Sequence, residues 1–424
     1  MRVLILNTSE HTGGAAIAAN RLMEALNKNG VKAKMLVRDK QSQHILVSSL
    51  PASPLLKLKF VWERFVIWSA NRFKKHNLFQ VDIANVGTDI THMPEFKEAD
   101  IIHLHWINQG FLSLANIRRI VQSGKPVIWT MHDMWPFTGI CHYSGDCEAY
   151  QSHCHHCPML LNGGGRKDLS ERIFRKKASV LSKAHNIRFV ACSEWLKGLA
   201  ESSKLLENIP ICTIPNAINT SVFRPTDKTE ARKRHNLPTD KKLLLFGSQK
   251  ITDKRKGVKY LVEACQILNR QHPEISTQWG IVMAGSQSEQ IQELFPIPVY
   301  SVGYLNDEPS MAALYNAIDV YVTPSLQDNL PNTIVEAMCC GTPCVGFHVG
   351  GIPEMIDHQE NGYVARYRDA HDLAQGISFV LDNTEQYQNL SKNAARKAAN
   401  TYCESNVAMK YIHLYNQTTK KEKA

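Results

Sequence analysis

Several features that restrict the function of a protein are missing from this 424-residue sequence. Charged residues break each apolar run well before the roughly 18 residues that a membrane-spanning helix needs. The sequence has no low-complexity tract and no internal repeat period, and its N-terminal segment is too short and too quickly polar for a signal peptide. These absences predict a globular, cytoplasmic protein.

A disulfide framework is not expected either, although the chain contains 11 cysteines. Without a secretion signal, cysteines are expected to be reduced thiols in a cytosol.

The charge is unbalanced, with a net value of +10, so an acidic partner is expected. Nucleic acid, phosphorylated substrates and anionic lipid all qualify. No helix-turn-helix, zinc-finger or RNP-like segment is present, which argues against nucleic acid. An anionic membrane surface explains the charge better. It predicts peripheral attachment to the inner face of the cell membrane.

Part of the positive charge lies in residues 55–76, together with aromatic side chains. The cations are Lys57, Lys59, Arg64, Arg72, Lys74 and Lys75, and the aromatic residues are Trp62, Phe65, Trp68 and Phe73. A basic helix with aromatic residues on its other face can lie on an anionic membrane. The alternative is a buried helix whose lysine stems extend along apolar surface to reach water.

Short β-branched runs alternate with longer helical patterns in the first half of the chain. The predicted strands are residues 2–8, 31–37, 99–106, 126–132 and 187–193, and the predicted helices are residues 15–30, 114–124 and 170–185. Such alternation is typical of βαβ units, which form a parallel sheet with helices on both faces.

The alternation stops at residues 214–238, where turn residues and three prolines predict an interdomain linker, and it restarts at residue 241. At roughly 100–200 residues per domain, a chain of this length is expected to have two or three. We predict an α/β protein with two doubly wound domains facing a cleft, residues 1–215 and 216–400. Residues 401–424 are predicted to form a helix that packs back towards the first domain, with a disordered KKEKA end.

Two glycine pairs open predicted helices after strands. Gly13 and Gly14 follow the first strand, and Gly350 and Gly351 precede a helix with Pro353 in its first turn. Backbone N–H groups at a helix start favour an anion. A tight strand-to-helix turn needs glycine anyway, so the first pair is compatible with either role.

A cluster of cations follows the first strand of the second half. It contains Lys250, Lys254, Arg255 and Lys256, directly before Gly257 opens a helix. Cations at the carboxyl end of a strand, beside a helix start, suit a diphosphate. The alternative is a solvated basic loop.

Two acidic residues, Asp328 and Glu336, stand eight positions apart further along the chain. The first is predicted to lie in a loop after a strand and the second about one turn into the next helix, so both can face one pocket. Carboxylates accept hydrogen bonds from sugar hydroxyls. Together with the cations and the Gly350–Gly351 turn, they indicate a nucleotide-diphosphate pocket.

Taken in order, these motifs resemble those of the retaining glycosyltransferases of family 4, which have the GT-B fold of two Rossmann-like domains. The resemblance covers most of the chain. It rests on the Gly13–Gly14 turn, the pair His132–Asp133, the linker IPNAINTSVFRP, the pair Lys256–Gly257, an E-x7-E-like segment from Asp328 to Glu336, and GGIPEMI.

The resemblance implies that the first domain binds an acceptor and the second a nucleotide-sugar donor. Lys256, helped by Arg255, would neutralise the diphosphate leaving group. Glu336 would bind the ribose, and Asp328, next to Asn329, the hydroxyls of the donor sugar. His132 would lie near the sugar and the acceptor, so His132, Asp328 and Lys256 are the implied catalytic residues.

Backbone amides at Gly13–Gly14 and around Gly350–Gly351 would complete the implied donor site. No metal or other cofactor is implied for catalysis, because cationic side chains and helix dipoles do that work.

Two residues depart from the family pattern. The first acid of the E-x7-E motif is the shorter Asp328, which puts the sugar specificity in doubt, and Ser248 stands where the family often has an arginine. Arg255 or Lys250 is expected to supply the missing charge.

Residues 139–158 form a loop dense in cysteine and histidine directly after the segment with His132. Its cysteines are Cys141, Cys147, Cys154 and Cys157. Only Cys154-x-x-Cys157 has the spacing typical of zinc, and the other two would complete a closed, structural tetrathiolate site. Reduced buried cysteines or a redox role are the alternatives.

The resemblance therefore implies an enzyme that moves a hexose-type sugar, with retention, from a nucleotide-diphosphate sugar to a glycan or a lipid-diphosphate-linked saccharide. Bacterial surface polysaccharide synthesis is the expected process. The alternatives are a nucleotide-sugar epimerase of the same fold and a non-catalytic nucleotide-sugar binding protein.

Overall fold

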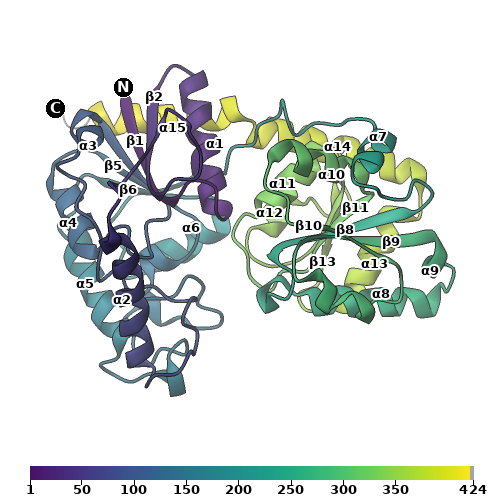
Figure 1. Ribbon diagram of the computed structural model, residues 1–424, viewed down its shortest axis with the longest axis horizontal. Helices are drawn as coiled ribbons and strands as arrows, with labels where there is room; N and C mark the ends of the chain where they lie inside the picture. Colours follow the sequence, from purple (N-terminus) through teal and green to yellow (C-terminus); the bar gives the residue numbers. More distant parts are fainter. Residues whose placement is uncertain (421–424) are drawn as a thin grey trace. The chain divides into compact units, whose positions relative to one another are not determined.

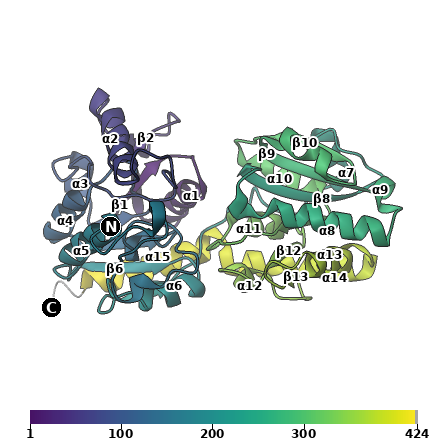
Figure 2. The same ribbon diagram turned by 90° about the horizontal axis from the view of Figure 1, so that it is seen from below.

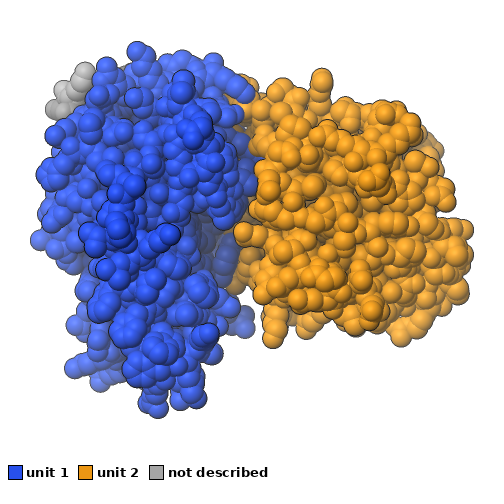
Figure 3. Space-filling model, viewed as in Figure 1, with its two compact units in different colours: residues 1–215, 407–424 blue, residues 216–406 orange. Residues whose placement is uncertain are grey.

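The predicted alternation of strands and helices is present throughout the computed structural model, which describes residues 1–420. The chain divides into two units (Figure 3): unit 1 comprises residues 1–215 and the C-terminal segment from residue 407, and unit 2 comprises residues 216–406. Each unit is built on its own sheet (Figure 1).

The sheet of unit 1 has seven parallel strands in the order β3-β2-β1-β4-β5-β6-β7. The strands are β1 (Arg2–Ser9), β2 (Lys32–Asp39), β3 (Val47–Ser49), β4 (Ile101–Leu104), β5 (Val127–Met131), β6 (Ile187–Ala191) and β7 (Ile211–Thr213). The order reverses direction at β1 and β4, which confirms a doubly wound sheet.

The helices of unit 1 precede or connect these strands. They are α1 (Gly14–Lys28), α2 (Pro54–Ala70), α3 (Pro94–Glu98), α4 (Leu114–Gln122), α5 (Leu169–Leu181) and α6 (Glu194–Glu201), with short 3-10 turns η1 (Trp135–Phe137), η2 (Ala149–Gln151) and η3 (Leu161–Gly163). Ser113 at the start of α4 and Ser193 at the start of α6 accept backbone N–H groups of the first turn, which explains why these helices begin there.

The sheet of unit 2 has six parallel strands in the order β10-β9-β8-β11-β12-β13 and reverses direction at β8 and β11. The strands are β8 (Lys242–Lys250), β9 (Trp279–Ser286), β10 (Val299–Gly303), β11 (Val320–Thr323), β12 (Cys344–Phe347) and β13 (Gly362–Ala365). The prediction of a second doubly wound domain is thereby confirmed.

The helices of unit 2 include α8 and α13, which run side by side over one face of the sheet (Figure 2). The full set is α7 (Lys228–Arg234), η4 (Lys254–Lys256), α8 (Val258–Gln271), α9 (Ile275–Gln278), η5 (Ser288–Gln290), η6 (Gln292–Leu294), α10 (Glu308–Ala317), α11 (Asn332–Cys339), α12 (Ile352–Met355), α13 (Ala370–Leu381) and α14 (Thr384–Tyr402). Alternate strand residues, among them Leu244, Ile281 and Val322, fill the space under α8 and α13.

The segment predicted as a linker, residues 214–238, is more ordered than expected. It contains α7, and Arg232 on that helix donates to the Asp319 carboxylate at 2.7 Å and to the carbonyl of Ala317 at 2.8 Å. Lys228 also contacts Asp319, at 2.7 Å. These bonds attach most of the segment to unit 2.

The last helix, α15 (Glu404–Lys420), begins in unit 2 and continues in unit 1 from residue 407. Figure 1 shows it in yellow among the purple elements. The expected disorder of the KKEKA end concerns residues 421–424, which lie outside the described residues; Lys420 itself ends α15. Within residues 1–420, no helix combines the length and apolar character needed to cross a bilayer.

Two tyrosines of α15 bond to the centre of the unit 1 sheet. The hydroxyl of Tyr415 lies 2.7 Å from Nδ1 of His103 on β4, and the hydroxyl of Tyr411 lies 2.9 Å from the hydroxyl of Thr130 on β5. His103 and Thr130 also bond each other, at 2.8 Å. Because all four side chains are buried, these hydrogen bonds have no water to replace them.

We predict that Tyr415→Phe lowers the free energy of unfolding by about 1–3 kcal/mol, because it leaves the buried Nδ1 of His103 without its partner. Urea denaturation followed by circular dichroism measures the change. The exposed Tyr304 provides the control: Tyr304→Phe is expected to unfold at the wild-type urea concentration. Equal stability of wild type and Tyr415→Phe would contradict the prediction.

Candidate active site

The strand order of each sheet indicates where a ligand binds. In open α/β sheets, ligands bind beyond the carboxyl ends of the strands where the order reverses. In unit 2 these strands are β8 and β11, which are followed by the turn Lys254–Lys256 and by the loop with Asp328. In unit 1 they are β1 and β4, which are followed by Gly13 and by His105.

The two loops of unit 2 meet in an ion cluster. The Lys256 ammonium lies 2.5 Å from Oδ2 of Asp328, and Nη1 of Arg255 lies 3.6 Å from the same oxygen. Arg255 also donates to the carbonyl of Gln327 at 2.9 Å, and the N–H of Leu326 donates to the carbonyl of Arg255 at 2.7 Å. Two of the four predicted cations, Arg255 and Lys256, therefore form one cluster with the predicted sugar-binding acid.

The charge state of Asp328 follows from this cluster. Burial alone would raise the pKa of its carboxyl group, but Lys256 and Arg255, with a weaker contribution from Ser325, hold the pKa below its usual value. Asp328 is therefore ionised at neutral pH. Asp253 also lies 3.8 Å from Nη2 of Arg255, but with the exposed Lys254 of the same turn the cations still outnumber the carboxylates, three to two. The net positive charge favours an anionic ligand.

Close approach of two backbones explains two of the motif glycines. A Cβ atom at Gly257 would lie 1.9 Å from the carbonyl oxygen of Pro324, and one at Gly350 would lie 1.7 Å from that of Asp328. Both residues also have positive φ angles, 70° and 61°. These glycines bring the phosphate turn and the GG turn against the loop with Asp328.

The N–H of Gly351 differs from its expected role. It donates to the carbonyl of Asn329 at 2.9 Å, so in this structure it holds the loop instead of facing outward. The helix that follows, α12, is a single turn. Asn329 itself is buried.

Glu336 lies in the second turn of α11, eight residues after Asp328 and almost fully buried. One of its carboxylate oxygens accepts the hydroxyl of Tyr315 at 2.9 Å. Tyr315 is fully buried on α10, and burial, followed by the charge of Glu336, raises the pKa of its hydroxyl well above the usual value. Tyr315 therefore stays protonated, and its hydroxyl fixes the orientation of the Glu336 carboxylate.

In unit 1, Gly13 begins α1 with a φ angle of 92° and without a side-chain cap. The preceding Glu10 is buried, and its carboxylate accepts the backbone N–H groups of Gln41 at 2.6 Å and Ser42 at 2.8 Å. This carboxylate ties the turn after β1 to the loop after β2. Gly14 is exposed at the first turn of the helix.

His132 directly follows β5 and belongs to a row of three histidines. Its Nε2 lies 2.9 Å from Nδ1 of His105, and the ring of His105 lies 4.4 Å from that of His103. Burial lowers the pKa of His132 to about 4 and that of His103 to about 3. His132 is therefore a neutral, partly exposed imidazole at neutral pH, able to exchange hydrogen bonds with a ligand.

Asp133, next to His132, contacts His142, which lies in the cysteine-rich loop. The imidazole of His142 lies between Asp133, at 2.7 Å, and Asp82, at 2.6 Å. Burial opposes its charge, but the two carboxylates raise its pKa to about 10. Asp133 also accepts the indole N–H of Trp106 at 3.0 Å, and Asp82 bonds Arg64 of α2.

The contacts among the three histidines and the ion pairs around Asp133 were not predicted from the sequence. The His103-x-His105 pattern could have indicated the first of these, because alternate residues of a strand point to the same face, and His105 directly follows β4. Asp82 and Arg64 carried no signal, since they lie in irregular chain and on a helix whose cations were expected to be exposed. Arg64 is a correction to that expectation: it is buried against Asp82.

The cysteine-rich loop belongs to the core of unit 1. Cys141, Cys154 and Cys157 are buried, and burial raises the pKa of each thiol to about 12. Cys147 is partly buried, and none of the four forms a disulfide. Across residues 1–420, no group of three or more His, Cys, Asp or Glu side chains already has the arrangement to hold a metal ion.

Comparison with known families covers nearly the whole described chain. The family described as "Glycosyltransferase Family 4" matches residues 12–222, and the one described as "Glycosyl transferases group 1" matches residues 227–397. The chain belongs to these glycosyltransferases. This result confirms the resemblance drawn from the motifs.

Two curated relatives illustrate the sequence similarity of this glycosyltransferase. The D-inositol 3-phosphate glycosyltransferase of Thermobispora bispora is 26% identical over 200 residues, which cover 45% of this chain and 46% of the relative. The N,N'-diacetylbacillosaminyl-diphospho-undecaprenol alpha-1,3-N-acetylgalactosaminyltransferase of Campylobacter jejuni is 29% identical over 246 residues, 56% and 61% of the two chains. The match therefore spans about half the length of these relatives.

Solved structures show the fold of the glycosyltransferase. Sucrose-phosphate synthase from Thermosynechococcus elongatus has a TM-score of 0.69 at 20% identity, over 99% of this chain and 100% of that one. Anabaena HepE in complex with UDP-glucose has a TM-score of 0.64 at 16% identity, over 98% and 100%. With the two doubly wound sheets, these similarities show a GT-B fold.

We predict that His142→Asn destabilises the glycosyltransferase by about 3–5 kcal/mol, because it leaves Asp133 and Asp82 without the cation between them. Urea denaturation at neutral pH measures the loss. His153→Asn, in the same loop but with a side chain 40% exposed, is the matched control and is expected to change stability little. Similar effects of the two variants would contradict the role of the bridge.

Proposed function

We propose that this glycosyltransferase moves a hexose-type sugar from a nucleotide-diphosphate sugar to a glycan or lipid-linked saccharide acceptor, with retention of configuration. The process we propose is bacterial surface polysaccharide synthesis. The observation that carries the proposal is the cluster of Lys256, Arg255 and Asp328 at the strand reversal of unit 2. Such a cluster, with an excess of positive charge, suits the diphosphate of a nucleotide sugar.

In this proposal, Lys256 and Arg255 receive the diphosphate as it leaves. The leaving group gains negative charge in the transition state, so cations placed there stabilise the transition state more than the bound donor. When the diphosphate engages Lys256, the carboxylate of Asp328 is released to accept hydroxyls of the donor sugar. The 2.5 Å contact between the two residues supports this exchange of partners.

We assign the remaining contacts with the nucleotide sugar from the positions of the residues in the fold. Glu336 accepts the ribose hydroxyls with the carboxylate that Tyr315 orients. Asn329 and the Gly350–Gly351 turn shape the loop around the sugar. The amides at Gly13–Gly14 and the neutral imidazole of His132 are assigned to the sugar and acceptor in unit 1.

UDP is the nucleotide we expect to bind, because the HepE structure with a similar fold holds UDP-glucose. Incubating the protein with UDP- and GDP-sugars, with and without lipid-linked acceptors, tests the function. Release of free nucleotide only in the presence of acceptor supports transfer. Conversion of the sugar without acceptor indicates an epimerase instead, and tight binding without any product indicates a non-catalytic binding protein.

We also propose that α2 attaches the protein to an anionic membrane, at the inner face of the cell membrane. Its apolar face, composed of Leu55, Leu58, Val61, Trp62 and Phe65, is exposed, with Trp62 at 50% and Phe65 at 44%. Exposed cations, Lys57, Arg72, Lys74 and Lys75, lie on the same segment. This exposure favours membrane contact over the buried-helix alternative. The Campylobacter relative, named for a diphospho-undecaprenol acceptor, supports a lipid-linked substrate.

We predict that Lys256→Ala and Glu336→Ala each lower the transfer rate by at least about 100-fold while the protein stays folded, because they remove the diphosphate and ribose contacts. A coupled assay of released nucleotide measures the rate, and a melting curve checks the fold. Lys254→Ala, an exposed lysine of the same turn, is the matched control and is expected to keep most of the activity. Near-normal turnover of Lys256→Ala would falsify the donor site.

We predict that the double variant Trp62→Glu and Phe65→Glu abolishes cosedimentation with phosphatidylglycerol vesicles at low salt, because it places charge on the α2 apolar face. Met409→Glu changes an equally exposed apolar residue elsewhere and is expected to bind like wild type. Wild-type protein that stays in the supernatant at low salt would overturn the membrane proposal, while leaving the transferase proposal intact.

A further inference from the structure

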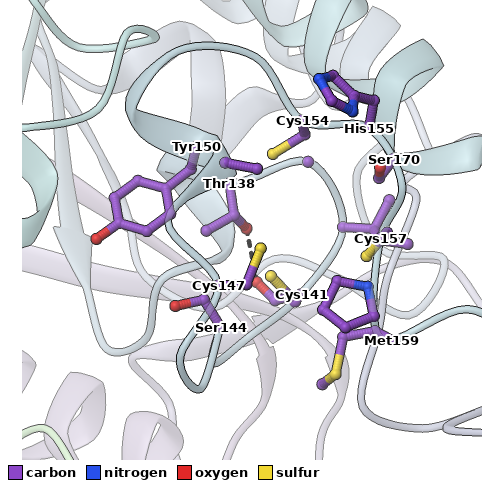
Figure 4. Close-up of a pocket in the computed structure, with 14 residues that line it drawn as sticks. Thr138, Cys141, Ser144, Cys147, Tyr150, Cys154, His155, Cys157, Met159 and Ser170 are labelled. Atoms are coloured by element: carbon purple, nitrogen blue, oxygen red, sulfur yellow. Dashed lines mark hydrogen bonds between the residues drawn. The ribbon is translucent and has the colours of Figure 1, made fainter. Parts of the chain in front are cut away.

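The four cysteines of residues 139–158 line one small cavity in unit 1 (Figure 4). The centre of a water-sized sphere has about 10 Å³ available there, which is room for a single small occupant. Figure 4 shows the thiols of Cys141, Cys147, Cys154 and Cys157 around the space that the loop encloses. Residues far apart in the loop are thus brought to one small volume.

The lining of this cavity selects the kind of occupant. Besides the thiols it contains hydroxyls, one imidazole and apolar groups, and it contains no carboxylate: the other lining residues are Thr138, Gly139, Ile140, Ser144, Ala149, Tyr150, His155, Pro158, Met159 and Ser170. Carboxylate and carbonyl oxygens suit magnesium and calcium, whereas thiolates suit zinc. The chemistry of the wall therefore points to zinc.

The Cys154-x-x-Cys157 turn lies on the wall of this cavity, and both of its cysteines are buried.

The turn is held from outside by Asp168, the first residue before α5. Its carboxylate accepts the N–H of Cys157 at 2.9 Å and that of Gly165 at 3.1 Å, and it caps α5 through the N–H of Glu171. One carboxylate therefore fixes the position of Cys157 relative to a helix of the core. This is the kind of support that a ligand-bearing turn requires.

A buried lysine lies beside the cluster. Lys177 of α5 donates to the carbonyls of Trp135 and, at 3.0 Å, Thr138, and its ammonium lies 3.5 Å from the centre of the Trp135 ring. Four thiolates around Zn²⁺ carry a net charge of −2, and an ammonium group at this position would offset part of that charge.

We propose that Cys141, Cys147, Cys154 and Cys157 hold one zinc ion in a closed structural site. Binding forms four Zn–S bonds of about 2.3 Å and releases the four thiol protons to solvent. Because the thiols do not yet have ligating geometry within residues 1–420, the ion draws the sulfur atoms inward into the shared cavity. Four protein ligands leave no position for water, so the site braces the loop that carries His142.

The zinc content of the purified, full-length protein tests the proposal independently of sugar transfer. Mass spectrometry of metals is expected to find one zinc per chain after reconstitution under reducing conditions and desalting. Replacement by Co²⁺ is expected to give the strong thiolate charge-transfer band and the visible bands of a tetrahedral site. Folded wild-type protein that retains no zinc, or a Co²⁺ spectrum without thiolate bands, would overturn the site.

Variants separate the four ligands from other cysteines. Cys154→Ser and Cys147→Ser are each expected to lose the stoichiometric zinc and to lower the melting temperature. Cys265→Ser, which changes a buried cysteine of α8 in unit 2, is the matched control and is expected to retain one zinc. Retention of a full equivalent by both loop variants would also overturn the proposal, and the wild-type measurements decide the question if a variant does not fold.

Discussion

All strands of a parallel sheet end on the same side, the carboxyl end of the sheet, and the rest of the molecule depends on that constraint. Because a crossover helix returns the chain to the opposite side before the next strand begins, every loop that follows a strand lies at the carboxyl end. In unit 2 this places the turn before Gly257 against the loop with Asp328. Lys256 of the turn contacts Asp328, although the two residues are 72 positions apart in the sequence. In unit 1 the same constraint places His105 beside His132.

Each unit keeps a buried carboxylate ionised at the carboxyl end of its sheet, and the cation that does this differs between the units. Asp328 is held by Lys256 and Arg255, flexible side chains at the start of a helix. Asp133 is held by His142, an imidazole fixed between two carboxylates. The Lys256 side chain is 22% exposed, so in our proposal it can leave Asp328 for a ligand. The imidazole of His142 is 13% exposed and contacts a carboxylate through each ring nitrogen, so it positions the residues around it.

The sequence predicted the doubly wound sheets well, because strands such as β1 and β5 are continuous apolar runs and helices such as α4 have a clear apolar period. It missed β3, β7 and β13, which are three or four residues long and lie at sheet edges. It placed Asp328 in a loop after a strand and Glu336 about one turn into the next helix, and both residues lie there. It did not predict the partner of either one, since Lys256 and Tyr315 meet them through the tertiary fold.

The α2 helix shows why an exposed apolar face and a buried charge belong together. Glu63 is fully buried and accepts the N–H groups of Ile83 at 2.9 Å and Ala84 at 2.7 Å, while its neighbour Arg64 bonds Asp82. A helix that turns its charged residues inward must turn the next residues, Trp62 and Phe65, outward. Asp82 in turn binds His142, so the orientation of α2, the cysteine-rich loop and the segment with His132 are fixed by one continuous set of charges. An interaction at the outer face of α2 therefore acts on an element that is connected, through Asp82 and His142, to the segment with Asp133 and His132.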